Sequence, residues 1–296
     1  MQVESHSAAD ERGSVFDQVP APGLVLVGIA TVQVGAASAT KLFNHLGPAG
    51  TVMLRVLFAA IVLWAISRPV PREHSRAELR LATLFGLTLA FMNLSFYEAI
   101  DRIHLGIAVT LEFVGPLGVA LFGSRTRLDV LWALLAAAGV VLLGGIGTPD
   151  LTGMFFALLA GGFWAAYILL NARVGRTFPG GSGLAMAMAI GTIPLIPIGI
   201  MDAGSNLLHP GLLAVAFAVA MLSSVIPYSL EVEALRRIRP NVFGVLMSLE
   251  PAVAAIAGLI LLSQSLSAVD VVAIALVVTA SAGATLGART PAPVDA

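Results

Sequence analysis

Four ionisable side chains lie inside otherwise apolar segments of the chain: Glu112, Glu250, Arg55 and Lys41. A charge at the centre of a membrane helix costs about 2.5–3.5 kcal/mol, so we expect each to face a bundle interior or water. A carboxyl group shielded from water favours its protonated form, so either glutamate could bind and release a proton as water reaches it. That is the chemistry of a proton-coupled carrier.

A structural role is the alternative for the two glutamates. Arg55, Lys41 or nearby hydroxyl groups would then hold the carboxylates, and two positive groups would neutralise two negative ones. Lys41 lies near the expected end of a helix, where its long side chain could instead reach water. Glu112 and Glu250 lie deeper, roughly 12–14 Å into their segments, near the middle of a 30 Å hydrocarbon core.

Three of the prolines in the apolar segments lie near these candidate residues. A proline has no N–H group, so Pro116 leaves the carbonyl of Glu112 without its helical donor. Pro251 does the same for the carbonyl of Met247, and Pro227 for that of Ser223. Free backbone acceptors are tolerated inside a membrane only away from lipid, so we expect these helix breaks to face a cavity.

Uncharged polar side chains in the apolar segments are weaker candidates for lining such a cavity. In membrane proteins these groups more often bond neighbouring helices to one another. The candidates are Gln33, Asn93, Tyr97, Tyr228 and Ser248, with Tyr167, Ser223 and Ser224 as further possibilities. Glu231 and Glu233 follow Tyr228 at the expected end of a helix, and we expect both to be solvated.

The residues that would support enzyme chemistry are missing or badly placed. The chain has no cysteine, and its five histidines lie in the termini or at the edges of apolar segments. Neither an HExxH metal motif nor a nucleotide-binding loop occurs. We therefore expect no enzyme activity, no metal site and no cofactor.

The composition identifies the element type that must position these residues. The 296 residues are 58% hydrophobic and only 11% charged, whereas a soluble domain carries about 25% charged residues. The mean hydropathy is +0.94. These values exclude a soluble enzyme, a nucleic-acid-binding protein and a disordered scaffold, and they predict an all-α membrane protein embedded in a lipid bilayer.

Apolar runs of the length needed to cross a bilayer predict ten transmembrane helices. Short links containing proline, glycine and charged residues separate them. The expected spans are 22–42, 49–67, 79–99, 104–122, 128–147, 151–170, 183–201, 211–229, 241–262 and 268–287.

Arginines cluster in alternate links and indicate the orientation of the helices. The link between the second and third spans carries four of them, and further arginines lie between the fourth and fifth, sixth and seventh, and eighth and ninth spans. Because basic loops stay on the cytoplasmic side, we expect these links and both termini to be cytoplasmic.

The two halves of the chain resemble each other. The segment GIAVTLE at 106–112 aligns with GVLMSLE at 244–250, and a proline follows each glutamate. Five spans per half is an odd number, so the second copy must be inverted relative to the first, as in many secondary transporters. We expect a polar tail at 1–21, repeats at 22–148 and 151–287, and a C-terminal tail at 288–296.

Three stretches carry a resemblance to a known family. LGIAVTLEFVGPLGVALF at 105–122, PYSLE at 227–231 and FGVLMSLEPA at 243–252 resemble the threonine/homoserine exporters of RhtA type, in the EamA branch of the drug/metabolite transporter superfamily. The resemblance runs from about 22 to 287 and does not include the N-terminal tail.

The resemblance implies export of small neutral amino acids, threonine and homoserine foremost, across a bacterial inner membrane by proton antiport with alternating access. An exporter of another small metabolite or drug on the same fold is the nearest alternative. A channel and a membrane-embedded assembly subunit are alternatives of a different class. The implied partners are the amino acid, protons and lipid, with no nucleic acid, and no oligomeric state is predicted.

Overall fold

The computed structural model describes residues 19–122, 127–145, 150–178, 181–238 and 240–287. The expected C-terminal tail, most of the expected N-terminal tail, and the loop arginines Arg125 and Arg239 lie outside these residues. In the described part every regular element is helical. Eight helical segments there are long and apolar enough to cross a membrane, and Leu128–Leu143 is a shorter apolar helix.

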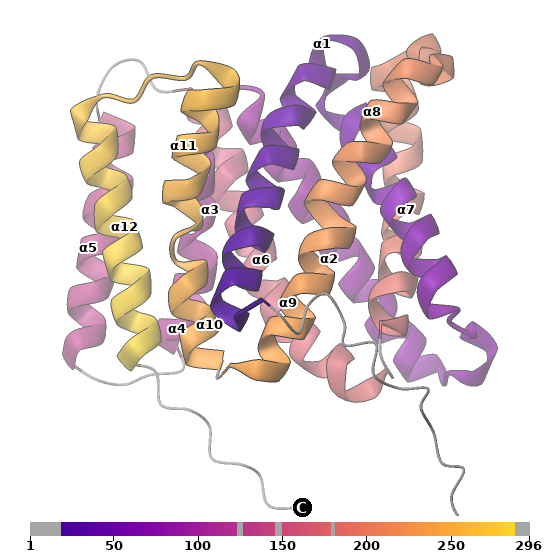
Figure 1. The fold of residues 1–296 in the computed structure, drawn as a ribbon, viewed down its shortest axis with the longest axis horizontal. Helices are drawn as coiled ribbons and strands as arrows, with labels where there is room; N and C mark the ends of the chain where they lie inside the picture. Colours follow the sequence, from indigo (N-terminus) through magenta and orange to yellow (C-terminus); the bar gives the residue numbers. More distant parts are fainter. Residues whose placement is uncertain (1–18, 123–126, 146–149, 179–180, 239, 288–296) are drawn as a thin grey trace, which may run out of the picture.

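The expected spans 22–42 and 49–67 fall in one 47-residue element, α1 (Ala21–Ser67), which is interrupted at Gly47. Figure 1 shows its first arm rising to a bend at the top and its second arm descending again. Gly47 has φ of 65°, in the left-handed region that favours glycine. Pro48 follows in the first turn of the second arm, where proline is tolerated. The link expected between the two spans is therefore helical except at the bend.

Side chains outside α1 hold this bend. The Asp202 carboxylate accepts hydrogen bonds from the backbone N–H groups of Ala49 and Gly50, at 2.9 and 3.4 Å. These N–H groups begin the second arm, so Asp202 caps it from another helix. The amide of Asn206 donates to the carbonyl of His45 on the other side of the bend.

The remaining spans follow the expected order. They comprise α2 (Arg76–Ile100), α3 (Leu105–Glu112) with α4 (Val114–Phe122), α5 (Arg127–Gly145), α6 (Leu151–Thr177), α7 (Ser182–Ala203), α8 (Pro210–Ala220) with α9 (Ile226–Arg237), α10 (Pro240–Met247) with α11 (Glu250–Leu262), and α12 (Ala268–Gly287). Two helices extend well past the expected boundaries: α6 continues beyond residue 170 and α9 beyond residue 229.

Three expected spans are broken near a proline. The α3–α4 helix is interrupted at Phe113, shortly before Pro116, and the α10–α11 helix at Ser248 and Leu249, just before Pro251. Between α8 and α9 the chain forms one π-helical turn, Met221–Val225, just before Pro227. Such turns accommodate backbone groups that cannot follow the regular α-helical bonding pattern.

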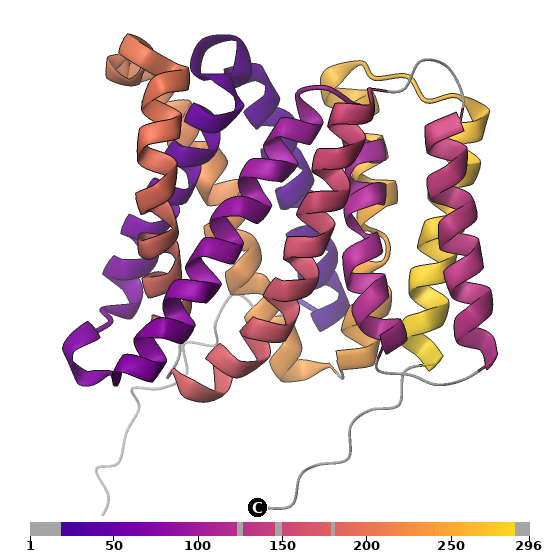
Figure 2. The same cartoon turned by 180° about the vertical axis from the view of Figure 1, so that it is seen from behind.

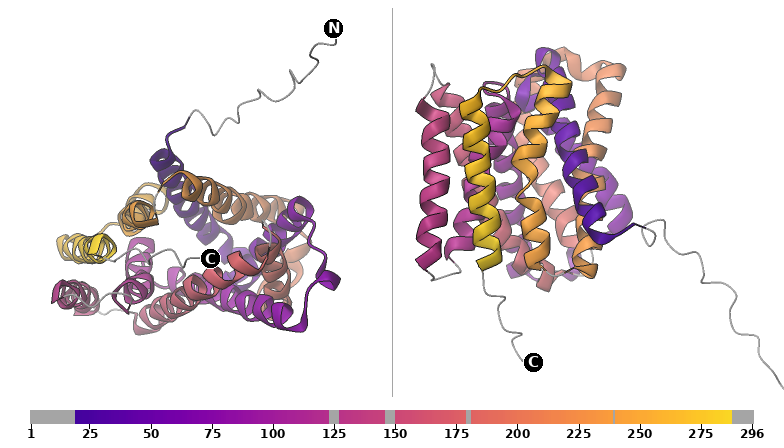
Figure 3. Two further views of the ribbon diagram at one scale, coloured as in Figure 1. Left: turned by 90° about the horizontal axis from the view of Figure 1, so that it is seen from below. Right: turned by 60° about the vertical axis from the view of Figure 1, so that its left-hand side comes forward.

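The helices are packed side by side, with α5 and α12 together at one edge of the molecule (Figures 1 and 2). The view from below in Figure 3 separates this pair from the larger group of helices. In Figure 1 the α3–α4 segment descends from the end of α2, whereas the α10–α11 segment rises towards the loop before α12. The two proline-containing segments therefore run in opposite directions.

Candidate functional site

A cavity of about 690 Å³ lies between the helices. Eight residues singled out in the sequence line it: Gln33, Arg55, Asn93, Glu112, Tyr228 and Glu250, with Pro116 and Pro227. They come from α1, α2, α3, α4, α9 and α11, so helices distant in sequence build a single site. Its size is that of a small-molecule pocket, and its apolar wall carries few polar groups, as in such pockets generally.

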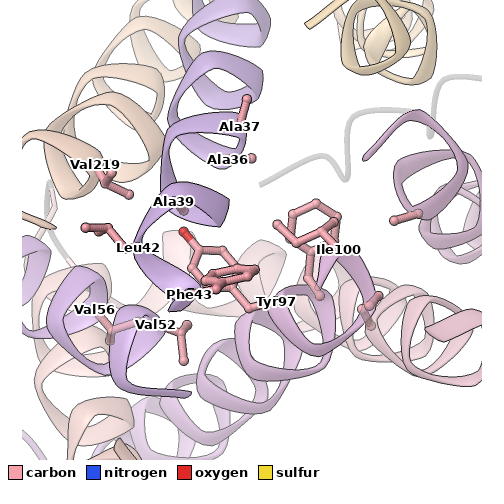
Figure 4. Packing of buried hydrophobic residues seen from close by; sticks show 14 of the residues in the cluster. Ala36, Ala37, Ala39, Leu42, Phe43, Val52, Val56, Tyr97, Ile100 and Val219 are labelled. Carbon is pink, nitrogen blue, oxygen red and sulfur yellow. The ribbon is translucent and has the colours of Figure 1, made fainter. Parts of the chain in front are cut away.

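The cavity extends towards the end of the bundle where the described loop arginines lie. Asn171 of α6, Glu231 of α9 and Thr285 of α12 line it close to the C-terminal ends of their helices. In Figure 1 these helix ends lie at the bottom, where α1 also begins. Towards the other end the side chains pack closely: the Phe43 and Tyr97 rings are 5.6 Å apart between α1 and α2 (Figure 4).

Arg55 links three elements at the inner part of the cavity. Its guanidinium donates to the Tyr97 hydroxyl at 3.2 Å, to the Ser224 hydroxyl at 3.2 Å and to the Ser223 carbonyl at 3.0 Å. The Ser223 carbonyl is the acceptor that Pro227 was expected to leave free. Arg55 therefore supplies the missing donor, and this hydrogen bond connects the break between α8 and α9 to α1.

The carbonyl freed by Pro116 is not presented to the cavity. A Cβ atom added to Gly161 of α6 would lie 2.5 Å from the Glu112 carbonyl oxygen, and one added to Gly115 would overlap the Gly161 carbonyl. The backbones of α6 and of the α3–α4 break therefore touch, and only glycine permits this approach. The Glu112 side chain lines the cavity while its main chain packs on α6.

The second break is tied to a different helix. The Ser248 hydroxyl bonds its own helix at the Gly244 carbonyl, at 3.0 Å, and lies 2.9 Å from the Ser281 hydroxyl of α12. Ser281 lines the cavity, whereas Ser248 lies just behind it. Glu250, which begins α11, faces the cavity and is only 6% exposed.

Four of the residues singled out in the sequence are not among those lining the cavity. Tyr97 and Ser248 contact residues that do line it. Pro251 is buried beside Glu250. Lys41 is exposed on α1, shortly before the bend at Gly47, where its side chain can reach beyond the apolar segment.

The expectation that Glu231 is solvated is wrong. It lines the cavity and is half-buried, because α9 continues to Arg237 and keeps this residue inside the bundle. Glu233 lies outside the cavity wall and pairs with Arg237, whose Nε donates to it at 2.8 Å. Other lining residues that the sequence did not favour include Trp164, Asn171 and Thr285. Tyr167 and Ser223, considered as possibilities, do line it.

The polar groups of the wall are incompletely paired. Among the described residues, the side-chain oxygen atoms of Gln33 and Ser223 are buried and have no hydrogen-bond partner. The cavity wall carries three carboxyl groups, those of Glu112, Glu231 and Glu250, against the single guanidinium of Arg55. In the part of the chain described, no carboxylate oxygen lies within 4 Å of an Arg55 nitrogen. Buried groups of this kind need a partner, which a bound ligand or proton would supply.

These features define a membrane transport protein whose helix bundle encloses a largely apolar cavity with a few ionisable side chains. Residues 151–286 match the EamA-like transporter family. The chain is 41% identical over 271 residues to the threonine/homoserine exporter RhtA of Salmonella typhimurium and to that of Escherichia coli, covering 90% of this chain and 91% of each relative. An uncharacterised transporter of Bacillus subtilis is 26% identical over 219 residues, 69% of this chain and 70% of that protein.

One solved crystal structure matches the fold with a TM-score of 0.61, over 90% of this chain and 97% of the other, at 19% identity. That likeness concerns the fold alone. The similarity to the exporters covers nearly the whole length of both proteins, and the chain therefore belongs to the EamA-like transporters, of the RhtA type.

Proposed function

We propose that this chain exports small neutral amino acids, threonine and homoserine foremost. The observation that carries the proposal is the cavity containing Glu112, Glu231 and Glu250, in a chain 41% identical to threonine/homoserine exporters over 90% of its length. A zwitterion needs an anionic acceptor for its ammonium group and donors for its carboxylate. The cavity wall offers both, since Arg55 and the Gln33 amide face the same space as the carboxyl groups.

The proposed topology is ten transmembrane helices in two inverted five-helix repeats, at 22–148 and 151–287. The two arms of α1 serve as the first two spans, and α5 and α12 end the repeats. The opposite course of α3–α4 and α10–α11 supports the inversion. The arginine-rich loops and both termini lie in the cytoplasm of a bacterial cell, with the chain in the inner membrane.

Transport proceeds by alternating access coupled to proton antiport. In the described conformation the cavity extends towards the proposed cytoplasmic side, where an amino acid enters. Glu112 carries the proton, and Glu250 accepts the substrate ammonium. Rocking of the two repeats then exposes the cavity to the other side, where the amino acid leaves and a proton binds.

The test is efflux of radiolabelled threonine and homoserine from proteoliposomes, with and without an imposed pH gradient. The proposal predicts saturable efflux that the gradient accelerates. Efflux no faster than from protein-free vesicles would remove the amino-acid assignment and favour another metabolite or drug. Flux without saturation or counter-transport would indicate a channel, and absence of any substrate-dependent flux would indicate an assembly subunit.

A further inference from the structure

Glu231 occupies a separate position in the cavity wall. It lies on the same face of α9 as Pro227, one helical turn further along the helix. It is nearer to the arginine-rich end of the bundle than Glu112 and Glu250. Its side chain is half-buried, whereas Glu112 and Glu250 are 9% and 6% exposed. Glu231 is therefore the carboxyl group that a ligand entering from that end meets first.

The ionisable groups around Glu231 favour a cationic ligand. Arg55 lies at the inner part of the cavity, where its guanidinium donates to the Tyr97 and Ser224 hydroxyls and to the Ser223 carbonyl. Glu250, Glu231 and Glu112 all line this one cavity. Among the described residues of the wall, three carboxyl groups face one guanidinium, that of Arg55. A cationic ligand would compensate the charge of a carboxyl group when it is ionised.

Aromatic residues line the same cavity as this carboxyl group. Tyr167 of α6 and Tyr228 of α9 line the same cavity as Glu231. Tyr167 is held in place by stacking on Phe85, with ring centroids 5.3 Å apart. Trp164 lines the cavity on the same helix as Tyr167. A cavity that holds both a carboxyl group and aromatic rings can bind an ammonium group through an ion pair and cation–π attraction.

We propose that Glu231, Tyr167 and Tyr228 form an ammonium subsite at the arginine-rich end of the cavity, and that this subsite binds primary amines even when they lack a carboxylate. The amine of an amino acid is recognised here first, as it enters, before it reaches Glu250 deeper in the cavity. The inference rests on the proposed function only in taking the cavity as the substrate site. It predicts a further class of ligand, amino alcohols, beyond the neutral amino acids.

Binding to the purified full-length protein in detergent tests the subsite separately from transport. The signal is the fluorescence of Trp164, with Trp64 and Trp132 replaced by phenylalanine because neither lines the cavity. The probes are L-threonine, L-threoninol, which keeps the amine and lacks the carboxylate, and 2,3-dihydroxybutanoate, which keeps the carboxylate and lacks the amine. Calorimetry on the unsubstituted chain checks the same three affinities.

Threonine and threoninol should both bind, and Glu231→Gln should weaken each of them by about tenfold or more. Glu231→Asp, which retains the charge, should restore part of the loss. Glu233→Gln is the matched control, because it removes a carboxylate from the same helix outside the cavity wall, and its affinities should equal those of the unmodified protein. Dihydroxybutanoate should bind far more weakly than either amine.

Threonine binding without threoninol binding would overturn the subsite while leaving the proposed export intact. Equal affinities in Glu231→Gln and Glu233→Gln would overturn it as well, as would binding of dihydroxybutanoate as tight as that of the amines or no binding of any probe. Binding of threoninol but not of threonine, lost in Glu231→Gln, would support the subsite and contradict the amino-acid assignment.

Discussion

The two glutamate-containing segments are related in sequence but place their carboxyl groups at opposite ends of a helix. Glu112 is the last residue of α3, whereas Glu250 is the first residue of α11. In each segment the break falls just before the turn that contains the proline. Pro116 comes four residues after Glu112 and Pro251 immediately after Glu250, so the break follows one glutamate and precedes the other.

This difference gives the two carboxyl groups different electrostatic surroundings. The start of a helix carries partial positive charge and its end partial negative charge. The dipole of α11 therefore stabilises the ionised form of Glu250, and the dipole of α3 destabilises the ionised form of Glu112. The segments also differ in what holds them, since Glu112 packs its carbonyl on Gly161 of α6 and the Ser248 break bonds to α12. This difference is the basis of our proposal that Glu112 carries the proton and that Glu250 accepts the ammonium.

The largest effect is expected from Glu112→Gln. Glutamine keeps the shape of the side chain but cannot bind and release a proton. Acceleration of threonine efflux by a pH gradient should disappear, whereas exchange of labelled for unlabelled threonine should continue. The measurement is efflux and exchange in the same proteoliposomes. Acceleration equal to that of the unmodified protein would remove Glu112 from the coupling mechanism.

Glu250→Gln should act on substrate affinity instead. Losing the charged acceptor for the ammonium should weaken threonine about ten- to hundredfold in exchange measured against substrate concentration. Saturating threonine should recover much of the rate, and the residual efflux should still respond to the pH gradient. If Glu112→Gln and Glu250→Gln had the same effect on threonine affinity and the same effect on the response to the pH gradient, the two segments would be functionally equivalent. The proposed difference between them would then be wrong.

The sequence indicated much of this site because charges and prolines are conspicuous in apolar segments. Glu112, Glu250, Arg55, Gln33 and Asn93 all line the cavity, as their placement in such segments suggested. The three helix breaks also lie beside the expected prolines.

What the sequence missed depends on tertiary packing. Glu231 stands among charged residues at the end of an apolar run, which is the pattern of a solvated helix terminus. Only the packing of α9 against α1 brings Glu231 into the cavity wall. Lys41 is a charge inside an apolar run, but it lies on an exposed face of α1. Gly161 and Gly162 are adjacent and cannot be told apart by any local pattern. In the structure the Glu112 carbonyl packs on Gly161, whereas Gly162 is exposed.

Gly161→Ala tests the packing of the first segment. The added methyl group would meet the Glu112 backbone 2.5 Å away, and the helices must separate to admit it. We expect a loss of about 1–3 kcal/mol in the free energy of unfolding. Gly162→Ala is the matched control, since no atom lies within 4 Å of its added Cβ, and it should leave stability unchanged or slightly raised. Unfolding in detergent measures both, and equal stabilities would contradict the close approach.

The smallest effect is expected at the second segment. Ser248→Ala removes the contact with Ser281 and should cost about 0.6 kcal/mol, the average for hydrogen bonds between membrane helices. A double-mutant cycle with Ser281→Ala isolates the contact from other consequences of the two substitutions. Strictly additive losses would show that this hydroxyl pair does not hold α10–α11 to α12.

Proton release on substrate binding examines the antiport most directly. Threonine added to the purified protein in weakly buffered detergent solution should acidify it, because the substrate displaces the proton held at Glu112. Glu112→Gln should bind threonine without acidification, and Lys41→Ala, which alters an exposed site, should behave like the unmodified protein. Threonine binding with no proton released, or the same release from Glu112→Gln, would contradict exchange of the two ligands in one cavity.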